Sequence, residues 1–144
     1  FYRIKKLDNG DKLKEVYDLG TLSWREAEKV IFDKGLSLLL EDSKFGNYSW
    51  NVMGSTLMYA ADLIPEIAED IVNIDRAMKW GFAWAKGPFE MIDDLGAYNC
   101  IEKCKKIGIM PKMLQILESS EGQKFYTDDG KYLSVSGSYE IIPE

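Results

Sequence analysis

Two clusters of carboxylates are the side chains most able to carry chemistry here, because the 144-residue sequence contains no histidine. Without histidine, a nucleophile would need a carboxylate or a lysine as its base. Adjacent residues on a helix project about 100° apart, so Asp93 and Asp94 are not expected to share a proton as a catalytic dyad does. We expect this pair at a solvated helix end. The second cluster, Glu66, Glu69 and Asp70, suits the first turns of a helix, whose dipole favours negative charge.

Cys100 and Cys104 are four residues apart on a predicted helix, a spacing that two metal ligands can use. A tetrahedral site needs further ligands, and the sequence has neither a histidine nor a third cysteine. We therefore interpret both residues as small apolar or half-buried thiols and expect no metal. The sequence also lacks G-x-G-x-x-G and G-x-x-x-x-G-K-[ST]. These motifs cradle phosphates, so no cofactor is expected in this chain.

Aromatic residues are numerous in the middle of the chain and could suggest an aromatic ligand box. They fall at helical spacing, however, so we expect core packing instead; the residues concerned are Trp50, Tyr59, Trp80 and Trp84. Phe82 and Phe89 are interpreted in the same way. Asn51 is a polar residue beside Trp50, at the start of the longest predicted helix. It is the single residue that we nominate for a site, as a substrate-binding candidate.

Composition limits the class of protein. With 46% hydrophobic residues, 144 residues suit one ordinary domain. The net charge of −6 argues against a nucleic-acid partner, which needs a basic face. No apolar run reaches the roughly 20 residues of a membrane span, and the start does not resemble a signal peptide, so a cytoplasmic location is expected. The chain starts without Met, within a predicted strand, which suggests a piece of a longer polypeptide.

Turn and capping residues predict the secondary structure at the N-terminal end of the chain. Asn9-Gly10 supplies the positive φ angles of a tight hairpin turn within residues 1–18. The capping box Ser23-Trp24-Arg25-Glu26 predicts a helix running to about Asp33. Leu36 to Glu41 is expected to add another helical turn or two.

Helical periodicity begins at about Tyr48. Pro65 is expected to kink this long helix or to start a new one. Further helices are predicted where caps and prolines occur. They run over 73–79 with Asn73 as cap, over 89–95 after Gly87-Pro88 with Gly96 as the stop, over 98–106, and over 112–118 after Pro111. Phe125-Tyr126 and Tyr132 to Val135 flank Asp128-Asp129-Gly130 as a second hairpin.

The expected fold is therefore mainly α, a helical bundle flanked by short β-hairpins at both ends. We expect a connector with a hairpin and a short helix over 1–47, a helical domain over 48–120, and a C-terminal hairpin and tail over 121–144.

Several spaced motifs carry a family resemblance. Ile74-Asp75-Arg76-Ala77-Met78, Gly81-Phe82 and Gly87-Pro88-Phe89-Glu90 with Asp93 resemble the helical C-terminal domain of 3-hydroxyacyl-CoA dehydrogenases. Tyr59-Ala60-Ala61 and residues 64–68, with Phe125-Tyr126 and Tyr132, resemble more narrowly the long bacterial enzymes that join this dehydrogenase to an enoyl-CoA hydratase. The resemblance covers about residues 48–135. It implies a bundle of the 6-phosphogluconate-dehydrogenase C-terminal-like type.

The resemblance also implies a function and partners. The parent would oxidise 3-hydroxyacyl-CoA to 3-ketoacyl-CoA with NAD in fatty-acid β-oxidation, and its upstream NAD-binding domain would carry the catalytic base. This chain looks like the second of two tandem helical domains, packing against the first and supporting the acyl-CoA cleft. Asn51 falls where the family's helical-domain asparagine lies, but Val52 replaces the arginine that usually follows. Ala85-Lys86 likewise departs from the pattern before Gly-Pro. Both departures favour a structural copy.

A second function class stays open beside this one. The chain could be a helical dimerisation or adaptor module without an enzyme context. A stable homodimer with no affinity for an upstream dehydrogenase fragment would favour the adaptor.

Overall fold

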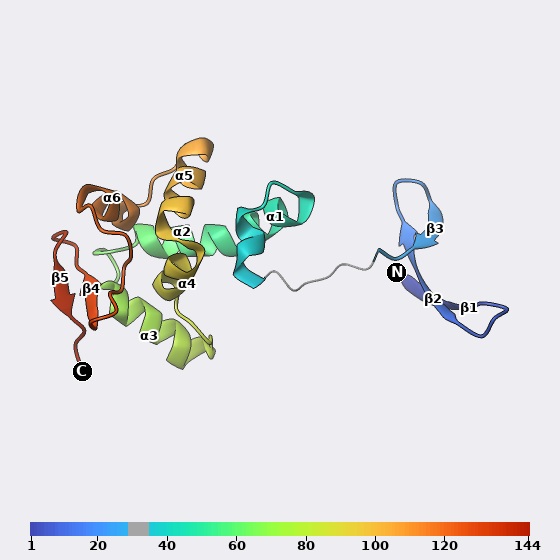
Figure 1. Cartoon of the computed structure of the whole chain (residues 1–144), viewed down its shortest axis with the longest axis horizontal. Helices are drawn as coiled ribbons and strands as arrows, with labels where there is room; N and C mark the ends of the chain where they lie inside the picture. Colours follow the sequence, from blue (N-terminus) through green and yellow to red (C-terminus); the bar gives the residue numbers. More distant parts are fainter. Residues whose placement is uncertain (29–34) are drawn as a thin grey trace. The chain divides into compact units, whose positions relative to one another are not determined.

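The computed structural model describes residues 1–28 and 35–144. The chain divides into two compact units, Phe1–Asp33 and Lys34–Glu144. The structure is mainly helical, with short antiparallel strand pairs toward both ends, which confirms the predicted fold class (Figure 1). The particular bundle type and the boundaries expected at residues 47 and 120 stay predictions. Within the described ranges, no helix combines the length and apolar character needed to cross a membrane.

The first unit is an antiparallel sheet in the order β1-β2-β3. Its strands are β1 (Tyr2–Lys6), β2 (Lys12–Asp18) and β3 (Ser23–Glu26). The predicted hairpin is confirmed, with Gly10 at φ 88° in its turn. The Gly10 N–H donates to the Leu7 carbonyl at 2.9 Å, so the turn closes where the sequence places it.

The capping box at Ser23 to Glu26 predicts the wrong element, because these residues form β3 rather than the first turn of a helix. Pairing with β2 places Trp24 opposite Tyr17, and the two rings make an edge contact with centroids 5.3 Å apart. Arg25 donates to Asp18 at 3.0 Å. These cross-strand contacts outweigh the local capping signal. The remainder of the expected helix, residues 29–33, lies outside the described residues.

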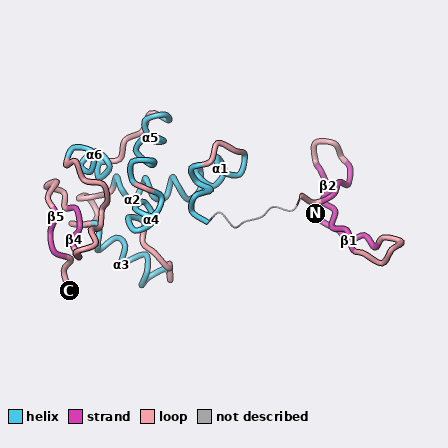
Figure 2. The backbone as a smooth tube through the Cα atoms, in the orientation of Figure 1, coloured by secondary structure: helices cyan, strands magenta, loops and turns pink. Residues whose placement is uncertain are grey.

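The second unit is built from helices followed by short strands, and the tube in Figure 2 shows this order. In chain order the elements are η1 (Gly35–Leu40), α1 (Lys44–Ser49), the π-helical η2 (Trp50–Gly54), α2 (Ser55–Asp62), α3 (Ile71–Phe82), α4 (Pro88–Leu95), α5 (Ala97–Ile107), α6 (Lys112–Ser119), β4 (Lys131–Leu133) and β5 (Tyr139–Ile141). The predictions at Gly87-Pro88, Gly96 and Pro111 are confirmed, because α4, α5 and α6 begin or end there.

The kink or new helix predicted at Pro65 and the helix start predicted at Asn73 are wrong. α2 ends at Asp62, and the N–H of Glu66 donates to the Leu63 carbonyl in the turn that follows. The next helix, α3, begins at Ile71 because the Asp70 side chain caps it by accepting the Asn73 N–H at 2.7 Å. A carboxylate that caps directly in this way is a strong start signal. It also assigns Asp70 a role that differs from the first-turn position expected for it.

One apolar core holds the helices of the second unit together. Leu57, Phe89, Ile92 and Leu114 are fully buried in it, and Trp50 is 4% exposed. The Phe89 and Phe125 rings meet at 4.9 Å between centroids, edge to face. This contact ties α4 to the segment that leads into the second hairpin.

The core prediction fails for several aromatic residues. Tyr59, Trp80 and Phe82 are 66%, 78% and 71% exposed. Trp80 and Phe82 lie in the last turn of α3, whose buried residues are all in its first half. Trp84, in contrast, is half-buried against the core. Helical spacing therefore predicted burial correctly for only some of these residues.

The second hairpin is more extended than predicted. Tyr126 and Tyr132 form an antiparallel bridge around the turn at Gly130, as expected. The longer pairing joins β4 to β5, with Tyr132 opposite Glu140. β5 therefore occupies part of the region that we expected to be a tail.

Candidate functional site

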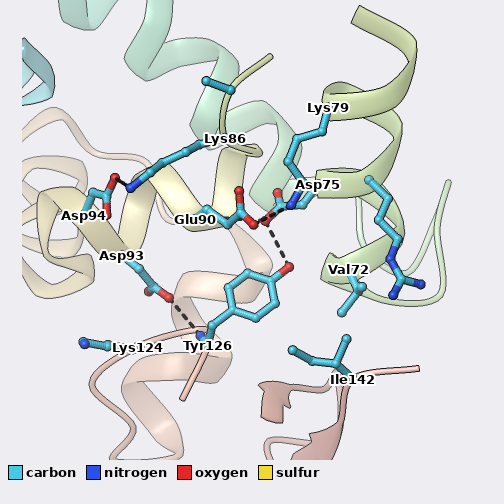
Figure 3. A pocket seen from close by; sticks show the side chains of 12 residues that line it. Val72, Asp75, Lys79, Lys86, Glu90, Asp93, Asp94, Lys124, Tyr126 and Ile142 are labelled. Atoms are coloured by element: carbon cyan, nitrogen blue, oxygen red, sulfur yellow. Dashed lines mark hydrogen bonds and ion pairs between the residues drawn. The ribbon is translucent and has the colours of Figure 1, made fainter. Parts of the chain in front are cut away.

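An open cleft of about 640 Å³ lies beside α3, α4 and the C-terminal segment. Figure 3 shows carboxylates, lysines and Tyr126 around it. Its lining residues mix charged and apolar side chains and are Val72, Asp75, Arg76, Lys79, Ala85, Lys86, Glu90, Asp93, Asp94, Lys124, Tyr126 and Ile142. It is the place in the second unit where the charged motif residues of α3 and α4 come together.

Asp75 forms the floor of the cleft and is 1% exposed. α3 directs this side chain at the first turn of α4, where helices leave backbone N–H groups without intrahelical partners. Its carboxylate accepts the N–H groups of Phe89 at 2.9 Å and Glu90 at 3.1 Å. It also accepts the Tyr126 hydroxyl at 3.0 Å. Asp75 thus caps α4 from a different helix and links it to the C-terminal segment.

Asp93, on α4, accepts backbone N–H groups in a similar way. Its two oxygens accept the backbone N–H groups of Phe125 at 2.7 Å and Tyr126 at 2.8 Å. Two carboxylates on α3 and α4 therefore fix the same tyrosine, one through its hydroxyl and the other through its backbone (Figure 3). The prediction that Asp93 is a solvated helix end is wrong, whereas Asp94 is exposed as expected.

Burial raises the pKa values of the acidic side chains in this cleft. It raises the pKa of Asp75 to about 6 and that of Asp93 to about 6, against the opposing effect of the hydrogen bonds that both accept. Burial also raises the pKa of Tyr126 far above its ordinary value, and the nearby Asp75 charge adds to the rise. Tyr126 therefore stays protonated and donates to Asp75 throughout the physiological range.

Lysines at the rim of the cleft are paired with carboxylates. Lys79 donates to Glu90 at 2.6 Å, and Lys86 donates to Asp94 at 2.5 Å. Glu90 also accepts the Gly87 N–H at 2.8 Å, which completes the start of α4 that the Gly-Pro sequence predicts. These partly exposed pairs contribute little each, so the buried hydrogen bonds beneath them determine the geometry.

The chemistry that this cleft can perform is limited. The oxygens of Asp75 and Asp93 are already engaged by backbone N–H groups and by the Tyr126 hydroxyl of the chain itself. Across residues 1–28 and 35–144, no three side chains of the metal-ligating types gather in one place. The geometry fits a structural junction between α3, α4 and the C-terminal segment.

The two cysteines are buried in the core and carry free thiols. Burial raises the pKa of Cys100 to about 12 and that of Cys104 to about 11, so neither is a thiolate at neutral pH. The Cys104 thiol lies 3.1 Å from the Met58 sulfur. The interpretation as buried thiols is confirmed.

Asn51, the one nominated site residue, lies in the π-helical turn η2 and is exposed. It is not among the residues that line the cleft, and its role in substrate binding stays a prediction. Asp75 belongs to the motif Ile74 to Met78, but the motif alone indicates no role for it. A lone acidic residue among the apolar positions of α3 was the available signal, because such a residue needs a buried partner.

Comparison with known proteins gives three relatives. A Bacillus subtilis protein named as a 3-hydroxyacyl-CoA dehydrogenase is 40% identical over 116 residues, covering 74% of this chain and 15% of the relative. Proteins of Rickettsia felis and Rickettsia prowazekii, each named as a fatty acid oxidation complex trifunctional enzyme, are 37% and 34% identical over 64% and 86% of this chain. The Rickettsia matches span 13% and 18% of those proteins, so this chain covers less than a fifth of each relative. No family model and no solved structure matches the chain.

Proposed function

We propose a function from the premise that this chain belongs, as a segment, to the family of 3-hydroxyacyl-CoA dehydrogenases. It is a structural domain of a fatty-acid oxidation enzyme that oxidises 3-hydroxyacyl-CoA with NAD. Within that enzyme it stands as the second helical domain, packs against the first, and supports the acyl-CoA cleft. The catalytic base belongs to the upstream part of the polypeptide, which we place in the cytoplasm.

The proposal rests on the hydrogen bonds that the chain itself makes to the motif carboxylates. Asp75 and Asp93 accept five hydrogen bonds between them, four of which come from backbone N–H groups. Carboxylates engaged in this way hold α3, α4 and the C-terminal segment together, which supports a structural role. The residues present do not fit NAD either, because the sequence lacks a glycine-rich phosphate loop.

Exposed aromatic side chains supply the surface for packing. Trp80 and Phe82 are more than two-thirds exposed at the end of α3, and Arg76 lies over the Trp80 ring at 5.6 Å. Large aromatic residues are common anchors of protein interfaces. Because both side chains are exposed within this chain, we assign them as anchors for the upstream helical domain.

Mixing the pieces of the enzyme tests the proposal. The chain and the separately expressed upstream fragment are combined, and NADH formation from a 3-hydroxyacyl-CoA is followed, with each piece alone as a control. Activity that appears or rises only in the mixture supports the structural role. Trp80→Ala with Phe82→Ala should then weaken the association, whereas the matched exposed variant Tyr98→Ala should not.

Two results would contradict the proposal. The first is an upstream fragment that is fully active alone and does not bind this chain. The second is a stable homodimer of this chain in sedimentation with no affinity for that fragment. The second result would favour the dimerisation or adaptor module.

A further inference from the structure

One face of the first unit gathers lysines from two strands. Side chains of alternate residues share a face of a sheet, and the register places Lys6 directly opposite Lys12 and Ile4 opposite Lys14. Tyr2 begins the same face. We call these five residues, Tyr2, Ile4, Lys6, Lys12 and Lys14, the lysine face.

Two carboxylates close to these lysines in the sequence, Glu15 and Asp18, pair with arginines instead. Glu15 points to the opposite face, where it pairs with Arg3 at 2.5 Å. Asp18 lies on the same side of the sheet as the lysine face, but it pairs with Arg25 at 3.0 Å. Within the described parts of the chain, Lys6, Lys12 and Lys14 form no ion pair.

Two like charges directly opposite each other destabilise a strand pair, and an anion between them removes that cost. The Lys14 ammonium lies 5.0 Å from the centroid of the Tyr2 ring, and Tyr2 is 69% exposed. The face therefore offers two unpaired ammonium groups beside a third that flanks an open aromatic ring. Lysine binds phosphate as a point charge, and an open aromatic ring stacks on a nucleotide base.

Protection of a sheet edge does not account for all of these lysines. Lysines on edge strands discourage pairing with other chains, and β1 is an edge strand. Lys12 and Lys14, however, lie on β2, the central strand of the sheet. Their presence on the open face needs a different reason.

We propose that the lysine face binds the phosphate-bearing nucleotide end of coenzyme A. The phosphates lie between Lys6 and Lys12, and the adenine stacks at Tyr2. The choice of coenzyme A as the nucleotide rests on the proposed function, whereas the anion site rests on the sheet alone. Residues 1–33 contain seven basic and seven acidic residues. The attraction is therefore local and suits a small anion better than a long nucleic acid.

The test is a titration of the full chain with coenzyme A, followed through backbone amide chemical shifts of β1 and β2. Saturable binding by coenzyme A and by 3′,5′-ADP is expected, with no binding of pantetheine, which lacks the phosphates. Lys12→Glu should weaken binding at least about tenfold, and added salt should weaken it as well. Lys5→Glu is the matched control, because it lies on the other face and removes the same charge.

Folding of the variants is checked in the same spectra. Lys12→Glu places a carboxylate opposite Lys6, which favours the hairpin, so loss of binding is not expected to reflect loss of the sheet. Absence of saturable binding overturns the proposal, and so does an equal loss in Lys5→Glu. Tighter binding of single-stranded RNA than of coenzyme A overturns it in favour of a nucleic-acid surface. The packing test involves Trp80 and Phe82 of the second unit, so either proposal can fail without the other.

Discussion

The carboxylate of Asp75 occupies the space that a side chain on Gly87 would fill. A Cβ built at Gly87 overlaps the carboxyl group of Asp75, although the backbone of Gly87, at φ −77°, is open to any residue. The glycine is therefore required for close approach rather than for its backbone freedom. The Gly-Pro start of α4 and Asp75 of α3 therefore depend on each other. Because Gly87 has no side chain, the Asp75 carboxylate can reach the N-terminus of α4.

Replacement of Gly87 tests this relationship. Gly87→Ala should lower the free energy of unfolding by about 1 to 3 kcal/mol, because Asp75 must move away from the N–H groups that it caps. Gly81→Ala is the matched control, since a Cβ at Gly81 meets no atom within 4 Å. At this exposed position of α3 that change should stabilise by up to about 1 kcal/mol. Urea unfolding followed by circular dichroism measures both, and equal effects of the two changes would contradict the close-approach argument.

The Tyr126 hydroxyl provides a second test of the junction. Tyr126→Phe removes only the donor to Asp75, and we expect a loss of about 1 to 3 kcal/mol, the range for hydrogen bonds to charged groups. The Tyr98 hydroxyl forms no hydrogen bond with the described residues, so Tyr98→Phe should change stability by less than about 0.5 kcal/mol. Thermal unfolding of the two variants side by side provides the comparison. A Tyr126→Phe chain as stable as the parent would show that the hydroxyl contributes no net stability.

Sequence patterns placed the helices of the second unit well where a start or stop signal is local. Gly87-Pro88, Gly96 and Pro111 act within their own turns, and the helices follow them. Ser23 to Glu26 failed because its capping signal competes with pairing to β2, which depends on residues elsewhere in the chain. Asp70 was missed as a cap because Pro65 offered an alternative start nearby.

The site was harder to predict than the fold for the same reason. Asp75 and Asp93 gain their roles from backbone N–H groups 14 and 32 residues away. No local pattern shows that these segments meet. Trp80 and Phe82 have the spacing of core residues, but their burial depends on which surface of α3 has a neighbour. Periodicity indicates a face, and only the packed structure shows whether that face is covered.

Stability should depend on pH through the buried aspartates. Burial raises the pKa of Asp75 to about 6 from an ordinary value near 3.8, so between these values the native state holds a proton that the unfolded state has lost. The contribution of Asp75 to stability therefore falls as the pH rises from about 4 to 6, by up to about 3 kcal/mol.

Asp75→Asn isolates this dependence, because asparagine does not titrate. Urea midpoints measured at pH 4, 5, 6 and 7 should show a smaller decline in the variant than in the parent. Asp93 remains in both proteins and cancels in the difference. Parallel curves for parent and variant would show that the pKa of Asp75 is the same in the native and unfolded states.

Phe89 is predicted to be the main anchor of the core. Its side chain is fully buried and meets Phe125 edge to face, so Phe89→Ala should cost about 3 to 5 kcal/mol through lost burial and the cavity left behind. Phe82→Ala is the matched control, because Phe82 is 71% exposed. That change should leave the melting temperature of the isolated chain unchanged while weakening association with the upstream fragment. An unchanged melting temperature for Phe89→Ala would refute its place as a core anchor. A large loss for Phe82→Ala in the isolated chain would show that Phe82 packs within this chain and is not available to a neighbouring domain.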